Sequence, residues 1–251
     1  MDSVQRFSGR TGNYRRYRPR YPHGLLDWLG GEAGLPAGAA VADVGAGTGL
    51  LTHLLLEGGY AVHAVEPNPD MRATAAEELQ GFPRLRLVAG TAEETTLPAG
   101  SVQMVAAAQA FHWFDPAKAA REFRRILSPG GLCVLLWNER DTAAAPLMRA
   151  YEDLLQGHGL DYEKVRYRNM DPGVFREFFG KPYRETEFSN SQTLDQEGFI
   201  GRLCSSSYTP PAGHPGHAPM LAAANALFSA HAQGGRVEII YRTRIYWGTM
   251  A

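Results

Sequence analysis

Cysteine is scarce in this sequence: Cys133 lies in an apolar run and Cys204 far downstream, and the 251 residues contain no others. Two cysteines without metal-ligand spacing argue against a disulfide-rich secreted scaffold, and we expect reduced thiols in a cytoplasm. Excess charge of one sign is absent as well, because 25 Lys and Arg against 26 Asp and Glu give a formal net charge of -1. That balance gives no general attraction to nucleic acid or to an acidic membrane.

Long apolar runs are also missing. No stretch approaches the roughly 20 apolar residues that a membrane helix needs. The N-terminal stretch MDSVQRFSGRTGNYRRYRPRYP is polar and arginine-rich and contains no apolar signal-peptide core. We therefore expect a cytoplasmic protein with no membrane partner and no nucleic-acid partner.

What the sequence does contain is a regular alternation of short apolar runs and helix-like patterns between residues 40 and 137. The apolar runs are AVADVG, AVHAVE, LRLVAG, VQMVAAAQ and LCVLLWN, and their lack of polar alternation is typical of strands buried on both faces. Candidate helices between them cover residues 50–57, 70–80 and 116–127. This order predicts an α/β fold with a doubly wound, mostly parallel sheet and right-handed crossovers.

Two regions depart from that alternation. A helix is expected near residues 23–32, before the first strand. After the fifth strand, residues 145–179 are predicted to be helical, followed by a strand near 183–188 and helices near 194–203 and 218–232. The stretch SSSYTPPAGHPGHAP predicts a loop, and the closing VEIIYRTRIYW predicts a terminal strand.

Alternate glycines follow the first predicted strand, at Gly45, Gly47 and Gly49, and an acid, Glu66, ends the second. Glycines at a strand-to-helix turn let the backbone approach a ligand closely, and the helix N-terminus offers unpaired N–H groups. An acid at an exposed strand end can accept both hydroxyls of a ribose. The pattern predicts a ligand that contains a nucleoside, but the dinucleotide fingerprint would require glycine where Leu50 stands.

The spacing D-x-G-x-G-x-G, which begins at Asp43, resembles motif I of the class I S-adenosylmethionine-dependent methyltransferases. AVEPNPDM and LVAGTAEETTLP resemble the second- and third-strand motifs of that family. VAAAQAFHWFDPAKAAREFRRILSPGGLCVLLWNERD is similar to the type 11 subgroup, with a turn at residues 129–131. AQAFHWFD, together with YRPRYP and SSSY, is similar to the trans-aconitate methyltransferase-like branch.

The resemblance implies a Rossmann-like, seven-stranded, mostly parallel sheet with an antiparallel terminal strand. We expect a single methyltransferase domain over residues 1–251. It would comprise an N-terminal cap segment (1–35), a cofactor-binding core (40–140), lid and substrate-side insertions with a sixth strand (141–235) and the terminal strand (236–251).

The resemblance also implies S-adenosylmethionine as cofactor. Glu66 would bind the ribose hydroxyls, Met71 would cover the adenine, and Arg18 would face the cofactor carboxylate. The implied cofactor-binding residues are Tyr14, Arg18, Asp43, Gly45, Ala46, Gly47, Gly49, Glu66, Pro67, Met71, Thr91, Ala92, Glu93 and Gln109.

Fewer residues point to the acceptor side, where we expect Tyr17, His112, Trp113, Trp137 and Tyr208. His112 is the candidate catalytic residue: it would be a general base for a hydroxyl or amine acceptor, or it would shape the pocket with Trp113. We favour the second role, because a carboxylate acceptor is already ionised. No metal site is expected, since no acid or cysteine accompanies the pair His214 and His217.

The functional expectation is therefore methyl transfer from S-adenosylmethionine to a small-molecule acceptor, at the oxygen of a carboxylate or hydroxyl. An arginine-rich segment would suit an acidic acceptor. Two alternatives stay open: a methyltransferase that acts on RNA or protein, and a non-catalytic S-adenosylmethionine-binding protein. The protein is expected to be a monomer or a homodimer.

Overall fold

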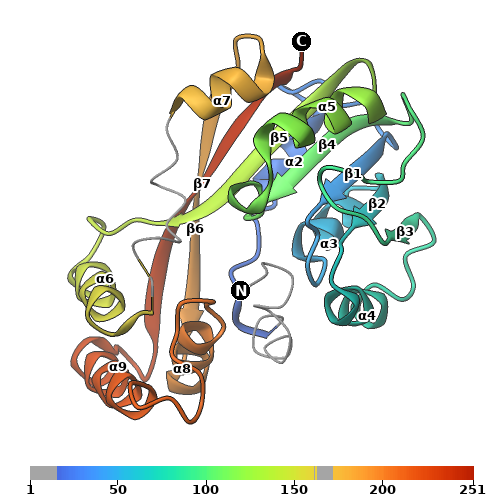
Figure 1. Cartoon of the computed structure of the whole chain (residues 1–251). Coiled ribbons are helices and arrows are strands. Elements are labelled where there is room, and N and C mark those ends of the chain that lie inside the picture. Colours follow the sequence, from blue (N-terminus) through green and yellow to red (C-terminus); the bar gives the residue numbers. More distant parts are fainter. Residues whose placement is uncertain (1–15, 161, 163–171) are drawn as a thin grey trace.

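The computed structural model describes residues 16–160, 162 and 172–251, so the predicted cofactor contact of Tyr14 lies outside the described residues. A seven-stranded sheet with strand order β3-β2-β1-β4-β5-β7-β6 forms its centre (Figure 1). The strands are β1 (Ala40–Val44), β2 (Ala61–Val65), β3 (Leu85–Val88), β4 (Val102–Ala108), β5 (Leu127–Arg140), β6 (Arg184–Leu194) and β7 (Val237–Thr249). Neighbours among β1–β5 pair in parallel, whereas β7 is antiparallel to both β5 and β6. The predicted α/β sheet with an antiparallel terminal strand is confirmed.

The helices of the described residues follow the strands in the expected alternation. They are α2 (Gly24–Gly30), α3 (Leu50–Glu57), α4 (Pro69–Glu78), the short 3-10 helix η2 (Phe111–Trp113), α5 (Pro116–Ile126), α6 (Pro146–His158), α7 (Pro172–Phe179), α8 (Gln196–Cys204) and α9 (His217–His231). Local chemistry fixes where several begin: the side chains of Asn68, Asp115 and Asp195 accept backbone N–H groups at the starts of α4, α5 and α8. In the part of the chain that the structure describes, no helix is long and apolar enough to cross a membrane.

Each face of the sheet is covered by its own helices, because alternate residues of a strand point to opposite sides. On one side, Val41 packs with residues of α2 and α3. On the other, Ala42 packs in a second core with residues of α5 and α7. This double cover leaves the carboxyl ends of the parallel strands as the edge at which a ligand can approach.

A third core, which we call the lid lobe, is built by α6, α8 and α9 on the first half of β7. Figure 1 shows these helices gathered around the lower ends of β6 and β7, away from α3 and α4. β7 therefore runs from the lid lobe, through Val237 and Tyr241, to the main core at Ile245 and Trp247.

Three predictions for the second half of the chain are corrected. Of the predicted helix over 145–179, the described residues form α6 and α7, which pack in different cores, and α6 ends at His158, where Gly159 turns to an extended backbone. The predicted strand at 183–188 is β6, which continues to Leu194, so the helix expected from 194 begins at Gln196 after its cap Asp195. The turn expected at 129–131 lies inside β5, as an irregularity where the pairing with β4 shifts.

Candidate active site

The three glycines between β1 and α3 serve different purposes. All have positive φ angles, of 72° at Gly45, 59° at Gly47 and 86° at Gly49, a region that disfavours other residues. A Cβ on Gly45 would lie 2.6 Å from the Cβ of Ala110, and one on Gly49 would lie 2.7 Å from Leu79 Cδ1. A Cβ on Gly47 would meet nothing within 4 Å. Packing therefore requires the outer two glycines, while Gly47 borders open space.

Glu66, at the end of β2, holds this loop in place. Its Oε2 accepts the N–H of Gly47 and its Oε1 accepts the N–H of Asn68, both at 2.9 Å. The expected exposed strand end is wrong, because Glu66 is 9% exposed. Burial raises the pKa of Glu66, while the two N–H bonds and the Arg72 guanidinium oppose that rise. A carboxylate has about four acceptor positions, so two remain for the hydroxyls of a ligand.

Glu66 and Gly47 belong to one pocket at the carboxyl ends of the strands. Its wall is formed by Gly45, Gly47, Glu66, Pro67, Asn68, Met71, Thr91, Ala92, Glu93, Ala108, Gln109, Ala110, Trp113 and Phe114. Most of the predicted cofactor residues are therefore brought together. Sequence reasoning missed Asn68, Ala108, Ala110 and Phe114, although the segment after β4 could have been found, since the ends of neighbouring parallel strands share one edge.

Gln109 contributes a strained backbone to the pocket. Its φ of 56° is unusual for a residue with a side chain. Its N–H donates to Leu136 O at 2.9 Å, and its side-chain amide donates to Asn138 O at 3.3 Å. Strain that surrounding contacts maintain is typical of functional sites.

Two predicted cofactor residues lie behind the pocket wall and one lies on the glycine loop outside it. Asp43 is buried, and its Oδ2 accepts the hydroxyl of Thr52 at 2.6 Å. Burial raises the pKa of Asp43 to about 6, and its Oδ1 has no hydrogen-bond partner within the described chain. Gly49 packs against α4, and Ala46 does not line the pocket. These positions shape the loop that carries Gly47.

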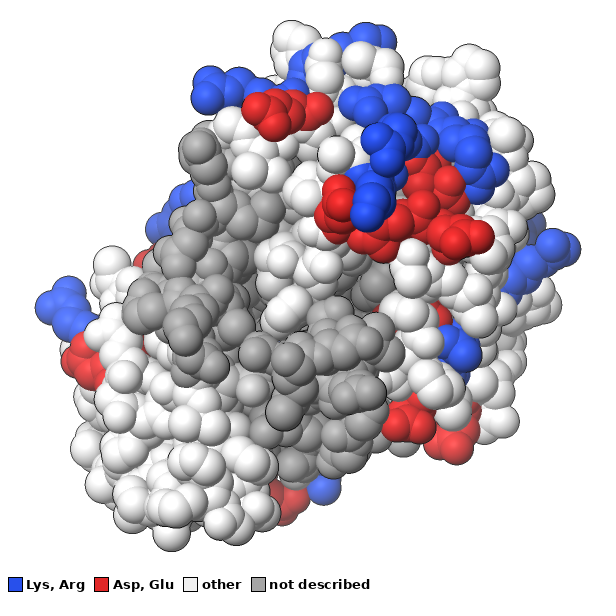
Figure 2. Space-filling view, viewed as in Figure 1, with Lys and Arg blue, Asp and Glu red and all other residues white. Residues whose placement is uncertain are grey.

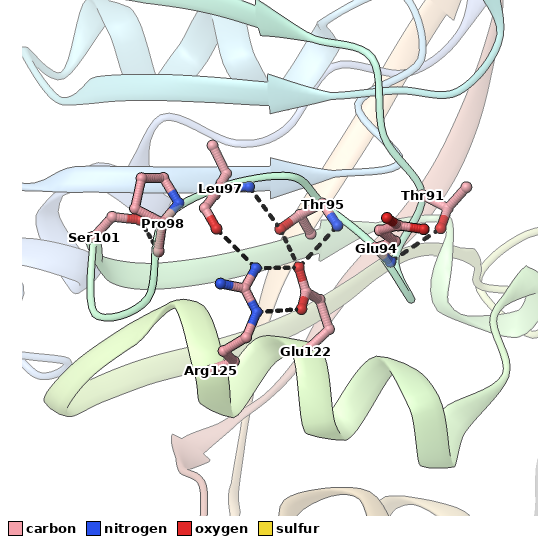
Figure 3. A network of polar contacts seen from close by, with 8 residues as sticks. All are labelled: Thr91, Glu94, Thr95, Leu97, Pro98, Ser101, Glu122 and Arg125. Atoms are coloured by element: carbon pink, nitrogen blue, oxygen red, sulfur yellow. Dashed lines mark hydrogen bonds and ion pairs between the residues drawn. The ribbon is translucent and has the colours of Figure 1, made fainter.

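A polar network holds the wall that contains Thr91, Ala92 and Glu93 (Figure 3). Glu122 of α5 accepts the N–H and the hydroxyl of Thr95, and Arg125 donates to both oxygens of Glu122 and to Leu97 O. These hydrogen bonds tie the loop after β3 to α5. Sequence reasoning missed Glu122 and Arg125, because Thr95 and Leu97, their partners in the loop after β3, lie more than 25 residues away in the chain.

Glu93 is a second anchor of the same wall. Its Oε1 accepts the N–H of Asp115 at 2.9 Å, so it joins the loop after β3 to the start of α5. Glu93 thus positions Trp113 and Phe114, which line the pocket just before α5.

His112 lies beside the pocket, in η2. Its ring is 4.8 Å from that of Trp113, and its Nδ1 is buried without a hydrogen-bond partner within the described residues. Burial and then the Arg18 guanidinium lower the pKa of His112 to about 4. The imidazole is therefore neutral near pH 7 and is a weak base.

The other predicted acceptor residues are dispersed. Trp113 lines the pocket, but Trp137 is fully buried in the core with Phe111, so the predicted acceptor contact of Trp137 is not supported. Tyr17 packs on α8 and donates to Glu197 Oε1 at 2.7 Å.

Arg18 and Tyr208 both lie toward the lid lobe. Arg18 donates to Ser205 O at 3.0 Å, so in this structure it meets the end of α8. The Tyr208 hydroxyl accepts from Arg140 at 3.2 Å. The residues that the structure describes include no group of three or more His, Cys, Asp and Glu that could hold a metal ion.

Known proteins resemble this chain in sequence and in fold. A family described as a methyltransferase domain matches residues 42–135. An uncharacterized methyltransferase of Mycobacterium tuberculosis is 47% identical over 209 residues, which cover 82% of this chain and 79% of that protein. An uncharacterized methyltransferase-like protein of Schizosaccharomyces pombe is 33% identical over 183 residues, or 65% of this chain and 70% of that protein. A solved Anaeromyxobacter dehalogenans protein named as a type II methyltransferase shares the fold, with a TM-score of 0.66 at 24% identity over 93% of this chain and 98% of that chain.

Proposed function

The chain belongs to the class I S-adenosylmethionine-dependent methyltransferases, and on this basis we propose that it methylates an oxygen atom of a small-molecule acceptor. The observation that carries the proposal is the pocket in which Glu66 and Gly47 meet at the carboxyl ends of the strands. We further propose that the enzyme works in the cytoplasm as a monomer or homodimer, with no nucleic-acid partner and no membrane partner.

The pocket residues fit S-adenosylmethionine. Glu66 keeps acceptor capacity for the ribose hydroxyls, and the space above Gly47 is one that a side chain would fill. Met71, 3% exposed and on the pocket wall, would cover the adenine, with Thr91 and Ala92 at its edge. When bound, the cofactor supplies a methyl group on a sulfonium, which has an activated leaving group.

Because the leaving group is activated, the chain's own residues contribute mainly by positioning. Holding two reactants in line is worth up to about 7–11 kcal/mol in well-oriented systems. A general base would work best with a pKa near the operating pH, whereas the pKa of His112 is about 4. This supports an acceptor that needs no deprotonation, and a carboxylate meets that requirement.

The charge distribution favours a small acceptor over a macromolecule. Figure 2 shows Lys and Arg interspersed with Asp and Glu at its upper right, and the lower left lobe is mostly uncharged on this face. The formal net charge of the chain is -1. Binding to RNA would require a continuous basic surface.

Two measurements test the proposal. Titration calorimetry with S-adenosylmethionine and with its demethylated product should show affinity in the micromolar range, about -8 kcal/mol. Methyl-labelled cofactor incubated with a metabolite extract should then give a labelled small molecule whose label is lost on mild alkaline hydrolysis, as a methyl ester requires.

Each alternative has its own signature. Label in the macromolecular fraction would identify an RNA or protein methyltransferase, and binding without any transfer would identify a non-catalytic protein. Label that survives alkaline hydrolysis would contradict methylation of a carboxylate. No heat with either form of the cofactor would overturn the assignment of the pocket.

A further inference from the structure

Arginine and tyrosine side chains, each buried or half-buried, gather between β5 and the lid lobe, outside the pocket described above. Arg140, at the end of β5, donates to the hydroxyls of Tyr208 and Tyr162 and to Glu152 Oε2. Arg202, on α8, donates to the hydroxyl of Tyr241 at 3.1 Å. We call this group the arginine–tyrosine cluster.

Arg202 is the least expected member of the cluster. It is 4% exposed, and its Nη1 donates to the hydroxyls of Ser205 and Ser206. Within the described parts of the chain, it forms no ion pair with a carboxylate, and its side chain donates to the hydroxyls of Tyr241, Ser205 and Ser206. A buried charge without a counter-ion is strongly destabilising, so this arrangement favours the binding of an anion.

Tyr151, on α6, supplies a second observation that points to a bound ligand. It is 1% exposed, and its hydroxyl has no hydrogen-bond partner among the residues that the structure describes. The Arg140 guanidinium lies 5.6 Å from the centroid of the Tyr151 ring, so Tyr151 belongs to the cluster. A buried hydroxyl is normally hydrogen-bonded, and an anion held by the two arginines would accept a hydrogen bond from it.

Arg18 connects the cluster to the cofactor pocket. Its guanidinium donates to Ser205 O, next to Arg202, and its charge also lowers the pKa of His112 and of Tyr208. His112 in turn contacts Trp113, which lines the pocket. Ser205 therefore joins Arg18 to Arg202, and Arg18 links the cluster to His112 beside the pocket.

We propose that Arg202 and Arg140 form the acceptor-binding site and hold a carboxylate of the acceptor, with the Tyr151 hydroxyl donating to the same group. The substrate class is then an organic acid. This inference rests on the proposed function, because it assigns the second substrate of that reaction. Arginine suits the role, since its planar guanidinium matches a carboxylate in two-point hydrogen bonding.

The test is ligand binding to the full chain, measured by calorimetry with succinate, with inorganic phosphate and with the uncharged succinamide. Succinate should bind the wild type, and succinamide should not. Arg202→Gln should weaken succinate binding roughly 10- to 100-fold, the equivalent of a lost charged hydrogen bond, while Arg202→Lys should retain part of it. The affinity for S-adenosylmethionine should stay unchanged in both variants.

Tyr151→Phe keeps the test decisive if Arg202→Gln does not fold. It removes a hydroxyl that has no partner within the described chain, so the fold should be kept while succinate binding falls by about 2- to 10-fold. Equal succinate affinity in the wild type, Arg202→Gln and Tyr151→Phe would overturn the proposal. Binding of phosphate without succinate would overturn the carboxylate assignment.

Two further outcomes separate this inference from the proposed function, and a third tests the anion site alone. Methyl transfer to an uncharged acceptor, unaffected by Arg202→Gln, would contradict the anion site and would still support the assignment as a methyltransferase. Arg202-dependent binding of succinate without methyl transfer to any acceptor would support the anion site and contradict the proposed methyl-transfer activity. An absence of anion binding together with tyrosinate absorbance at neutral pH would show that Tyr208 itself supplies the negative charge, and would overturn the site.

Discussion

At the residue scale, the carboxylates of the pocket accept hydrogen bonds from backbone N–H groups in the loops around them. Glu66 joins the loop after β1 to the start of α4, through Gly47 and Asn68. Glu93 joins the loop after β3 to the start of α5 through Asp115. These side chains are therefore structural ties as well as candidate ligand contacts, and a substitution should affect both properties.

Replacement of Glu66 tests this dual role. Glu66→Ala should weaken binding of S-adenosylmethionine by about 1.5–3 kcal/mol, because charge-assisted hydrogen bonds are lost. It should also lower the melting temperature, because the N–H groups of Gly47 and Asn68 lose their acceptor. Glu66→Gln keeps one acceptor oxygen, so its cofactor affinity and melting temperature should lie between those of the wild type and Glu66→Ala. Calorimetry and thermal unfolding measure the effects, and normal binding by the alanine variant would contradict the ribose assignment.

Replacement of His112 distinguishes a base from a pocket wall. A general base is worth about 10²–10⁴ in rate, whereas we expect His112→Ala to lower cofactor affinity and turnover together and by far less. Ionisation of His112 should not change the wild-type kcat/KM between about pH 6 and 8, because its pKa of about 4 leaves the imidazole neutral there. A large loss confined to turnover, rescued by added imidazole, would assign the catalytic role.

At the element scale, the turn between β1 and α3 combines a packing requirement with a ligand requirement, and two alanine variants separate them. Gly49→Ala should destabilise the fold, since overpacking against Leu79 costs about 1–3 kcal/mol in addition to the cost of its φ of 86°. Gly47→Ala bears only the conformational cost, about 1–2 kcal/mol, but places a methyl group at the open pocket. Urea unfolding should show the larger loss of stability in Gly49→Ala. Calorimetry should show that Gly47→Ala loses more cofactor affinity for each unit of stability lost. The reverse ranking would refute this division.

The junction between α5 and the loop after β3 predicts a pH effect. Hydrogen bonds from Arg125, and then those from Thr95, lower the pKa of Glu122 from 4.5 to about 2. Since the pKa is lower in the folded state, the stabilisation is present above about pH 4.5 and is lost as the pH falls toward 2. Glu122→Gln should lower the free energy of unfolding at neutral pH by about 1–3 kcal/mol.

Urea unfolding across this pH range checks the prediction. The difference between wild type and Glu122→Gln should shrink as the pH falls from 4.5 toward 2. The exposed Glu77 of α4 offers a control, and Glu77→Gln should change little. A constant difference at every pH would show that the loss is one of packing.

At the scale of the whole molecule, β7 belongs to both the main core and the lid lobe. Such continuity should make the described parts unfold together. Phe199 is fully buried in the lid lobe, 5.4 Å from the ring of Tyr151 and 5.8 Å from that of Phe228. Phe199→Ala should cost about 3–5 kcal/mol and shift one shared transition, seen at the same temperature by near- and far-UV circular dichroism.

The exposed Leu160 supplies the control for Phe199, because a leucine that is 40% exposed contributes little to a core. Leu160→Ala should leave the melting temperature nearly unchanged. Two separate transitions in Phe199→Ala, with the second unaffected, would show that the lid lobe unfolds alone.

The sequence predicted the main sheet and the position of Gly47 and Glu66 at its carboxyl edge because their signals are local. Each strand is one apolar run, and a loop directly after a strand must lie at the sheet's carboxyl edge, which placed Gly47 and Glu66 correctly. The lid lobe was less predictable. A polar strand at the sheet edge, such as the second half of β6, has no alternation strong enough to distinguish it from a helix.

The arginine–tyrosine cluster shows a second limit of prediction. Arg140 ends β5, Tyr151 lies on α6 and Arg202 lies on α8. They meet through tertiary packing, so no spacing in the sequence relates them. The available sign was a charged residue inside the apolar stretch GFIGRLC, which is costly unless it has a partner.

The position of β7 has a consequence for how the chain is made. β6 lies at the edge of the sheet, and its neighbour in the sheet is β7, which the ribosome synthesises about 40 residues later. Until residues 237–249 have left the exit tunnel, β6 has no strand to pair with, while β1–β5 can already form their parallel sheet. The insertion of β7 between β5 and β6 is therefore a late event of biosynthesis, and a nascent chain stalled before residue 237 would expose unpaired edges on both strands to chaperones.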